Sequence, residues 1–376
     1  EILKIRYEIP KLKREQAVNI DSFMFDEAHL AAELLSSASD RTITLRECDD
    51  IISRRRGGYW YADFEKKYMA ARETLAFFQS LNEVKIDIDS IEAGVHKYAG
   101  SWFEVDRHYR NSLYSLKKAG DDTTVIKLIE DVQKAYLNKY LLKLNDSWQR
   151  IVETHDLKTH GAVRQNGFYT KKIMPFCDGQ KKIGVIISDA LRYEVGVDIM
   201  EEIRREDKFE ASIEPIVSML PSYTQLGMAA LLPHRTLRLD GKGNVYADEK
   251  PTTGTQNRNT ILSGACKGGA LAIKSDDLMN LSRDAIRDYK RDNDVLYVYH
   301  NRIDSVGDKR DTEERVIEAV HEAITDILAL IRKLASADYY NMIITADHGF
   351  LYQDQPVADT DYIELGKEWS EAFFRD

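Results

Sequence analysis

Aspartate and histidine side chains follow three short apolar segments of this 376-residue sequence, at the point where each segment ends. These side chains are Asp189, Asp304, Asp308, Asp347 and His348. Four unneutralised carboxylates in one cleft would repel one another strongly, and bound divalent cations would remove that cost. Carboxylates combined with imidazole suit Zn²⁺ or Mn²⁺ better than Ca²⁺. The residue types therefore predict a site for a divalent metal, provided that the fold brings the three segments together.

A metal site of this kind can activate a hydroxyl, and the turn Pro221-Ser222-Tyr223-Thr224 places hydroxyls before an expected helix. The N-terminus of a helix favours a bound phosphate anion. A metal can also lower the pKa of a hydroxyl so that it attacks as an alkoxide. We expect Thr224 to be the nucleophile, with Ser222 and then Ser218 as the next choices. The alternative for each hydroxyl is a structural role as a helix cap.

The three apolar segments predict buried strands over residues 183–188, 294–299 and 339–346. Amphipathic patterns between them predict helices over residues 193–205, 225–232 and 313–334, a strand over 209–218, and an insertion or lid over 234–292. Strands that alternate with helices indicate a doubly wound α/β sheet. The carboxyl ends of such strands share one edge, so the candidate ligands should converge there. The alternative for Asp189 alone is that it caps the helix that follows it.

The first half of the chain predicts an all-α domain over residues 1–168, with the α/β domain over 169–376. No proline occurs between Pro10 and Pro175, which is natural for helices. An apolar face that runs from Trp60 to Leu75 at helical spacing indicates packing between helices. The segment from His160 to Gly167 has the composition of a solvated linker.

Composition limits the class of protein. A length of 376 residues predicts two or three domains, and the formal net charge of −10 argues against a surface coated for DNA binding. No apolar run is long enough to span a membrane, and the first residues show no signal-peptide pattern because they mix charged and apolar side chains. Three separated cysteines fit a reduced cytoplasmic chain. Because the sequence lacks an initiating Met and ends abruptly, we expect a fragment of a longer protein, truncated at its C-terminus.

Four segments together resemble the PglZ family of the BREX phage-defence systems, a branch of the alkaline phosphatase superfamily. They are residues 185–194, 220–228, 299–304 and 344–350, and the resemblance covers roughly 181–376. It implies an alkaline-phosphatase-like sheet, with the helical half as the region that precedes the catalytic domain. It also implies a phosphoester or sulfoester hydrolase that uses one or two divalent ions, with Zn²⁺ or Mn²⁺ expected.

The resemblance assigns roles to individual residues. Asp189 corresponds to the metal ligand after the first strand, and Thr224 to a nucleophile that also touches metal. Asp347 and His348 resemble a ligand pair of cofactor-independent phosphoglycerate mutases. The segment 304–308 resembles another of their ligand elements, with Asp308 where a histidine would stand, which favours a harder metal. No histidine follows His348, and His300 is a candidate for that role or for the outer shell.

The implied mechanism is an in-line attack by Thr224 on phosphorus, with one metal activating the nucleophile and the other stabilising the leaving oxygen. Arg192 and Arg258 are candidates for holding non-bridging oxygens; their alternatives are a helix-surface charge and a lid salt bridge. The BREX context favours a phosphodiesterase or nuclease acting on a nucleotide or nucleic acid, and a phosphomonoesterase is the close variant.

The alternative from another functional class is a largely non-catalytic scaffold. Such a protein would recruit a DNA methyltransferase and other BREX proteins, and the metal would only stabilise the fold. The long helical half would suit an interaction platform, and a homo-oligomer is compatible with it. No membrane partner is expected.

Overall fold

The computed structural model describes residues 14–20, 22–154, 164–177, 181–307 and 315–352. The chain divides into two compact units, Glu1–His160 and Gly161–Asp376, which we call the helical unit and the sheet unit. The second unit thus includes residues 161–168, which the sequence pattern assigned to the helical domain.

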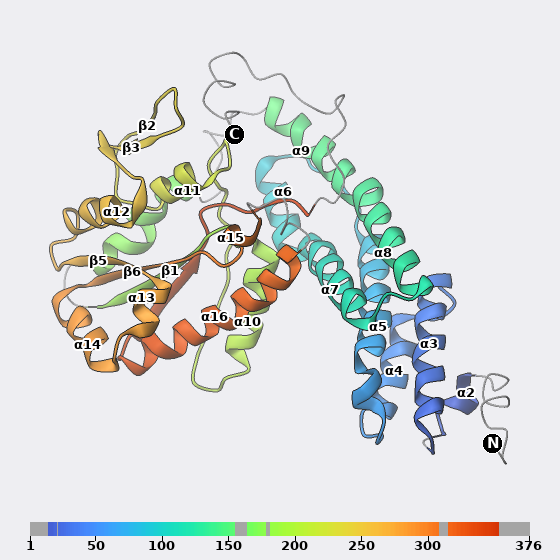
Figure 1. The fold of residues 1–376 in the computed structure, drawn as a ribbon. Helices are drawn as coiled ribbons and strands as arrows, with labels where there is room; N and C mark the ends of the chain where they lie inside the picture. Colours follow the sequence, from blue (N-terminus) through green and yellow to red (C-terminus); the bar gives the residue numbers. More distant parts are fainter. Residues whose placement is uncertain (1–13, 21, 155–163, 178–180, 308–314, 353–376) are drawn as a thin grey trace. The chain divides into compact units, whose positions relative to one another are not determined.

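The described residues of the helical unit form helices and short connecting segments, with no strand among them, as the sequence predicted (Figure 1). The α-helices are α2 (Arg14–Ala17), α3 (Met24–Asp40), α4 (Leu45–Arg55), α5 (Tyr61–Glu83), α6 (Ile91–Lys97), α7 (Phe103–Ala119), α8 (Thr123–Tyr136) and α9 (Leu142–Thr154). The π-helical turns η2 (Tyr98–Trp102) and η3 (Leu137–Leu141) join α6 to α7 and α8 to α9. Gly120, with a φ of 126°, ends α7, and the Asp122 side chain caps α8 by accepting from Val125 N.

The core of the helical unit is built around α5, whose apolar residues are largely buried. Tyr68 is fully buried and donates its hydroxyl to Glu27 Oε1 at 2.7 Å, and Glu27 forms a buried ion pair with Arg55. The expected face of α5 belongs to this core, since Leu75 is also buried while Trp60 is half-buried. The face therefore serves mainly to pack the helices together.

The sheet unit contains a four-stranded parallel sheet with the strand order β5-β6-β1-β7. The strands are β1 (Ile183–Ser188), β5 (Ala270–Lys274), β6 (Val295–His300) and β7 (Asn341–Thr345). The helices are α10 (Tyr193–Arg204), α11 (Thr224–Ala230), α12 (Gly254–Ser263), α13 (Ser275–Asn280), α14 (Arg283–Asp292), α15 (Asp304–Gly307) and α16 (Val316–Ser336), with short turns η4 (Gln165–Gly167), η5 (Tyr169–Ile173) and η6 (Met174–Phe176). Helices cover both faces of the sheet, so the predicted doubly wound α/β fold is confirmed (Figure 1).

Alternate residues of the strands face two separate cores. Along β1, Val185 and Ile187 pack into a core that includes residues of α11 and α12, whereas Ile186 packs into the core formed with α10 and α16. Successive side chains of a strand point to opposite faces. Asp189 lies two residues beyond Ile187, so the alternation directs it towards the side of the sheet that carries α11.

Two sequence expectations for this unit are wrong in detail. Residues 209–218 form no strand; only Val217 makes an isolated bridge, with Arg164. Half-buried and exposed side chains do alternate over residues 209–214, but the backbone of the segment joins neither sheet. The expected insertion over 234–292 is narrower, because residues 270–274 are the edge strand β5. Its distinct part is the small antiparallel sheet of β2 (Leu237–Leu239), β3 (Val245–Ala247) and β4 (Lys250–Pro251).

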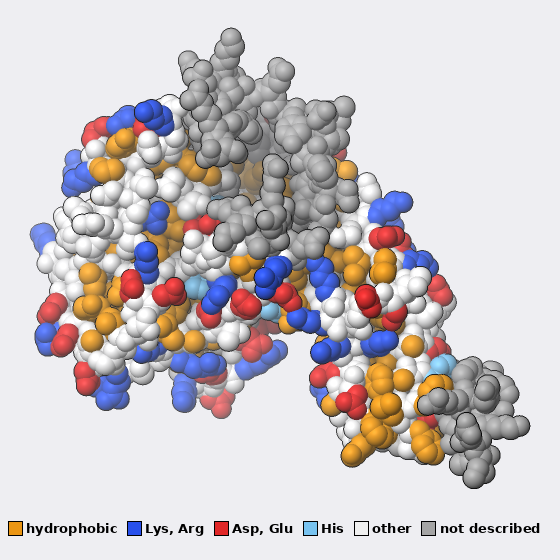
Figure 2. Space-filling view, in the orientation of Figure 1, with side chains coloured by type: hydrophobic (Ala, Val, Ile, Leu, Met, Phe, Trp, Pro, Cys, Tyr) orange, Lys and Arg blue, Asp and Glu red, His pale blue; other side chains and the backbone are white. Residues whose placement is uncertain are grey.

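Within the described ranges, no helix combines the length and the apolar character that crossing a membrane requires. On the face that Figure 2 shows, positive and negative side chains are interspersed over both units.

Candidate metal centre

The candidate ligands meet at the carboxyl ends of three strands. Asp189 directly follows β1, Asp304 begins α15 shortly after β6, and Asp347 follows β7 by two residues. The chain turns sharply at Ala190, which has a φ of 60°. This left-handed conformation is rare for a residue with a side chain, and such outliers cluster at functional sites. The turn directs the N–H of Ala190 to Asp347 Oδ1 at 3.1 Å, which ties the end of β1 to the end of β7.

The ring of His348 lies at the centre of this group. Its Nε2 is 3.4 Å from Asp189 Oδ1, 3.4 Å from Asp347 Oδ2 and 3.0 Å from Thr224 Oγ1. Its Nδ1 is 3.0 Å from the carbonyl oxygen of Gly349. A carbonyl only accepts hydrogen bonds, so Nδ1 carries the proton of the neutral ring and Nε2 presents its lone pair to the other three groups. The hydroxyl of Thr224 then donates to Nε2.

The electrostatics of the group favour a bound proton or a cation. Asp189 is 4% exposed and Asp347 is 1% exposed, and Asp189 Oδ1 and Asp347 Oδ2 accept no hydrogen bond within the described part of the chain. Burial and the neighbouring Asp347 raise the pKa of Asp189, and burial raises the pKa of Asp347. A buried polar atom without a partner costs about 1–3 kcal/mol. A shared proton or a metal ion would relieve this cost.

The spacing of these atoms fits a metal ion. Neighbouring ligands of an ion with bonds of about 2.0–2.1 Å lie about 3.0–3.4 Å apart, depending on whether the geometry is octahedral or tetrahedral. The separations from His348 Nε2 fall in this range. Asp304 is near as well, since Asp189, Asp304 and His348 each offer a ligand atom within 4.8 Å of the others. These carboxylates and the imidazole therefore form a candidate site for a divalent metal.

The remaining candidate ligands are Asp308 and His300. Asp308 lies outside the described residues. His300 is buried, with Nδ1 at 3.0 Å from Ser188 Oγ and Nε2 at 3.5 Å from Asp326 Oδ2. Both of its nitrogens therefore face other side chains, which suits support of the strand ends rather than ligation.

Thr224 reaches the site because α11 crosses the end of β7 closely. Thr224 is the first residue of this helix, and Gly227 lies one turn further on. A Cβ on Gly227 would lie 2.2 Å from the carbonyl oxygen of Asp347, so a side chain cannot fit at the present separation. Ser222 is exposed, and no hydrogen bond within the described residues links Ser218 or Ser222 to the site. Of the three predicted hydroxyls, the structure brings Thr224 to the ligands.

The two predicted arginines have different surroundings. The guanidinium of Arg192 donates to the carbonyl of Phe350 and stacks on Tyr352 at 4.6 Å, so it fastens residues 350–352 to the start of α10. Arg258 is 8% exposed, donates its Nε to Thr252 O at 2.9 Å and lies 5.0 Å from the ring centre of Tyr299. The positive charge of Arg258 partly opposes the burial and the Asp347 charge that raise the pKa of Asp189. Arg258 is therefore close enough to act on charge in the site.

Gln165 is a site residue that the sequence pattern missed, because it lies in the segment taken for a solvated linker. It is only 2% exposed. Its Nε2 donates to the carbonyls of Ala346 at 3.1 Å and Asp347 at 2.5 Å, and its Oε1 accepts from Met219 N at 3.1 Å. One amide thus joins the end of β7 to the segment that leads to Thr224. No local pattern marks a glutamine for this role, since its partners are 54 and 182 residues away.

Comparisons with known proteins agree with this arrangement. Residues 168–374 match a family described as the BREX system PglZ alkaline phosphatase-like domain. The chain is 35% identical to the alkaline phosphatase-like protein BrxZ of Escherichia coli O9:H4 (strain HS) over 353 residues, which cover 89% of this chain and 40% of that protein. It is 31% identical to the alkaline phosphatase-like protein PglZ of Bacillus cereus (strain H3081.97) over 342 residues, again 89% of this chain and 40% of the relative. The chain thus spans about 40% of the length of these two curated relatives.

Proposed function

This chain belongs to the PglZ family of the BREX phage-defence systems, as its four motifs predicted, and on that premise we propose that its sheet unit is a metal-dependent phosphoester hydrolase. We propose that the substrate is a phosphodiester in a nucleotide or nucleic acid. The reaction would serve phage defence.

The observation that carries the proposal is the convergence of four polar atoms from three distant segments. Asp189 Oδ1, Asp347 Oδ2 and Thr224 Oγ1 surround the lone-pair nitrogen of His348 at 3.0–3.4 Å. A purely structural site would pair such buried oxygens with hydrogen-bond donors, since unpaired ones destabilise the fold. Two carboxylate oxygens without donors beside a nucleophilic hydroxyl favour a site built for a cation and for chemistry.

Each residue has a role in this proposal. Asp189, Asp304, Asp347 and His348 hold the metal. When bound, a divalent ion supplies Lewis acidity that favours the ionised hydroxyl and the negative charge of the transition state. Thr224 would attack phosphorus through Oγ1 and displace the leaving alcohol, and water would then release the phosphoryl group from Thr224. The hydroxyl proton would go to solvent, because a metal would occupy the lone pair of His348 Nε2. The hydrogen bond from Ala190 N to Asp347 Oδ1 holds the carboxylates of Asp189 and Asp347 in position, so they need not rearrange during the reaction.

Arg258 is our choice for the residue that holds a non-bridging oxygen of the substrate, in preference to Arg192. The guanidinium of Arg192 is engaged with Phe350 and Tyr352, whereas that of Arg258 uses its Nε for Thr252 and acts electrostatically on Asp189. A planar guanidinium suits two phosphate oxygens at once.

The central test measures hydrolysis by the purified chain with Zn²⁺ or Mn²⁺. Bis-p-nitrophenyl phosphate is the diester and p-nitrophenyl phosphate the monoester, so the ratio of their rates separates the two substrate classes. We expect Thr224→Ala to abolish turnover and Ser222→Ala, two residues away and exposed, to retain it. Mass spectrometry of a quenched reaction should find a p-nitrophenylphosphoryl group on Thr224 with the diester and a phosphoryl group with the monoester. Equal activity of Thr224→Ala and the wild-type protein would disprove the nucleophile.

A second function, recruitment of other BREX proteins including a DNA methyltransferase, is favoured by a groove in the helical unit that is described below. A phage-protection assay separates the two roles. If Thr224→Ala protects cells as well as the wild-type protein, while changes in the helical unit remove protection, the recruiting role is the essential one. If Thr224→Ala alone removes protection, hydrolysis is essential.

A further inference from the structure

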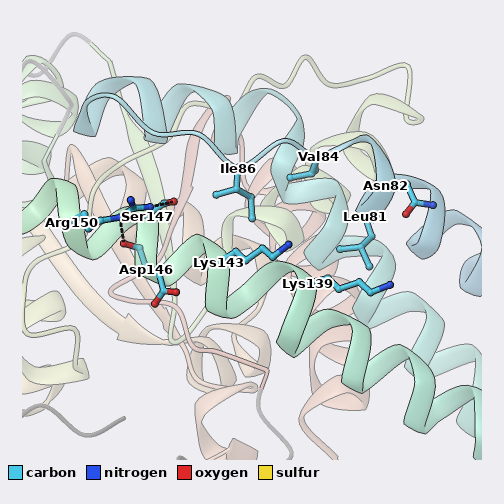
Figure 3. A pocket seen from close by; sticks show the side chains of 9 residues that line it. All are labelled: Leu81, Asn82, Val84, Ile86, Lys139, Lys143, Asp146, Ser147 and Arg150. Atoms are coloured by element: carbon cyan, nitrogen blue, oxygen red, sulfur yellow. Dashed lines mark hydrogen bonds between the residues drawn. The ribbon is translucent and has the colours of Figure 1, made fainter. Parts of the chain in front are cut away.

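The helical unit contains a groove that the proposed hydrolase chemistry does not use (Figure 3). It has a volume of about 580 Å³ and lies between the residues that end and follow α5 and the helical run η3–α9. Leu81, Val84 and Ile86 line one wall with aliphatic side chains. The facing wall carries Lys139, Lys143, Asp146, Ser147 and Arg150. One wall is therefore apolar and the other is mainly basic.

Lys139 and Lys143 bring two positive charges to the basic wall. Both side chains are exposed, and no hydrogen bond or ion pair within the described residues engages either ammonium. Arg150 adds a third cation and donates to the backbone oxygen of Asp146 and to Ser147 Oγ. The residues that line the groove thus include three cations and one carboxylate, that of Asp146, in a chain whose net charge is −10. A concave site of one sign attracts ligands of the opposite sign.

The basic residues share one helix face. Lys139, Lys143, Ser147 and Arg150 recur at spacings of four, four and three residues, which places them in line along the helix. Lys139 is the central residue of the π-helical turn η3. Such turns are rare and occur frequently at functional sites. The basic wall therefore contains a π-helical turn, which an ordinary solvent-exposed α-helix lacks.

The apolar wall is narrow and extended. Val84 continues from α5 in an extended conformation, with a φ of −73° and a ψ of 124°. Val84 and Ile86 are half-buried and point into the groove, whereas Lys85 between them is exposed. This alternation presents a short aliphatic strip parallel to the line of cations.

We propose that this groove binds an acidic peptide segment of a partner protein, with aliphatic residues on one side of the segment and carboxylates on the other. The carboxylates would meet Lys139, Lys143 and Arg150, and the aliphatic side chains would cover Val84 and Ile86. Single-stranded nucleic acid would also meet the cations, but its bases bind by stacking on aromatic rings. The residues that line the groove include no aromatic ring, so the peptide is the better match.

The test uses the full chain and fluorescence anisotropy with a short labelled peptide that alternates Glu and Leu. A labelled oligothymidylate of similar charge is the competing probe. We expect the peptide to bind more tightly than the oligonucleotide. We expect the double variant Lys139→Glu/Lys143→Glu to weaken peptide binding by about tenfold or more, because like charges across an interface cost several kcal/mol. Ile86→Ser should weaken it through the apolar wall.

Matched controls are Lys85→Glu and Lys134→Glu, which reverse exposed lysines that do not line the groove. Each should change the affinity less than twofold, and every variant should keep the wild-type phosphodiesterase rate, which makes the test independent of the proposed hydrolysis. Tighter binding of the oligonucleotide, no binding of either probe, equal losses in the controls, or self-association that the double variant abolishes would each overturn the proposal.

Discussion

Helix α11 lies very close to the end of β7, and adding a single methyl group at Gly227 tests the importance of this contact. Gly227→Ala would put a Cβ 2.2 Å from the carbonyl oxygen, 2.7 Å from the carbonyl carbon and 3.0 Å from the Cβ of Asp347. Ordinary carbon contacts lie at about 3.5–4.0 Å. The helix must therefore move away by roughly 1 Å or more. The backbone of Asp347 cannot yield instead, because its carbonyl accepts from Gln165 and its side chain from Ala190.

Thr224 moves with the helix, because it lies one turn before Gly227 on the same face. A shift of this size would lengthen the 3.0 Å separation between Thr224 Oγ1 and His348 Nε2 beyond hydrogen-bond range. Misplacement of a reacting group by about 1 Å can cost about 10²-fold in rate, and an overpacked core loses about 1–3 kcal/mol of stability. We therefore expect Gly227→Ala to fold, to lose about 10²-fold in kcat on bis-p-nitrophenyl phosphate, and to keep most of its Zn²⁺ affinity.

Gly196→Ala is the matched control. Gly196 also lies within a helix of the sheet unit, and its Cβ would meet only the tip of the Ile213 side chain at 3.1 Å, which can move aside. The measurements are kcat, Zn²⁺ affinity by titration and unfolding by denaturant. The reasoning fails if the kcat of Gly227→Ala is within about threefold of the kcat of Gly196→Ala while Thr224→Ala is inactive. In that case the close contact at Gly227 does not position the nucleophile.

Three further predictions follow from the same site. Gln165→Leu removes three hydrogen bonds to the backbone, of which the one to the carbonyl of Asp347 is buried and the other two are partly buried. A buried group left unpaired costs about 1–3 kcal/mol, so denaturant unfolding should show a loss of at least about 1 kcal/mol, and a change below about 0.5 kcal/mol would contradict the role of the amide. Burial and mutual repulsion raise the pKa of Asp189, and burial raises that of Asp347, so the metal-free protein should lose stability as the pH rises from about 4 towards about 8. Thermal melts should show that Asp347→Asn or added Zn²⁺ flattens this slope, and a metal-free protein that gains stability over that range would refute the assignment. Arg258→Lys keeps the positive charge but loses the planar hydrogen-bond donors of the guanidinium. A hydrogen bond to a charged group is worth about 1.5–3 kcal/mol, so the KM for the diester should rise about tenfold or more while the Zn²⁺ affinity stays the same. An unchanged KM would show that Arg258 does not bind the substrate.

The sequence predicted the fold class because its strongest signals are local. The run at 183–188 is largely apolar, and β1 is indeed buried along its whole length. Local residues also separate α7 from α8, since Gly120 adopts a φ that favours glycine and Asp122 caps the next helix. The segment 209–218 failed for the opposite reason. Alternation describes which side chains are buried, but a strand also needs backbone pairing with a neighbouring strand, which the local pattern does not report.

In the candidate site, too, local sequence determined some features and tertiary structure determined others. Local sequence determined that Asp189, Asp304, Asp347 and His348 follow strands, and the topology rule for parallel sheets then brought them to one edge. Tertiary structure alone decided which hydroxyl joins them, because that depends on how closely α11 crosses β7 at Gly227. It also decided that Gln165 is buried and donates to the carbonyl of Asp347, and that Arg192 donates to the carbonyl of Phe350. These contacts join residues more than a hundred positions apart, and only the packed chain determines such distances.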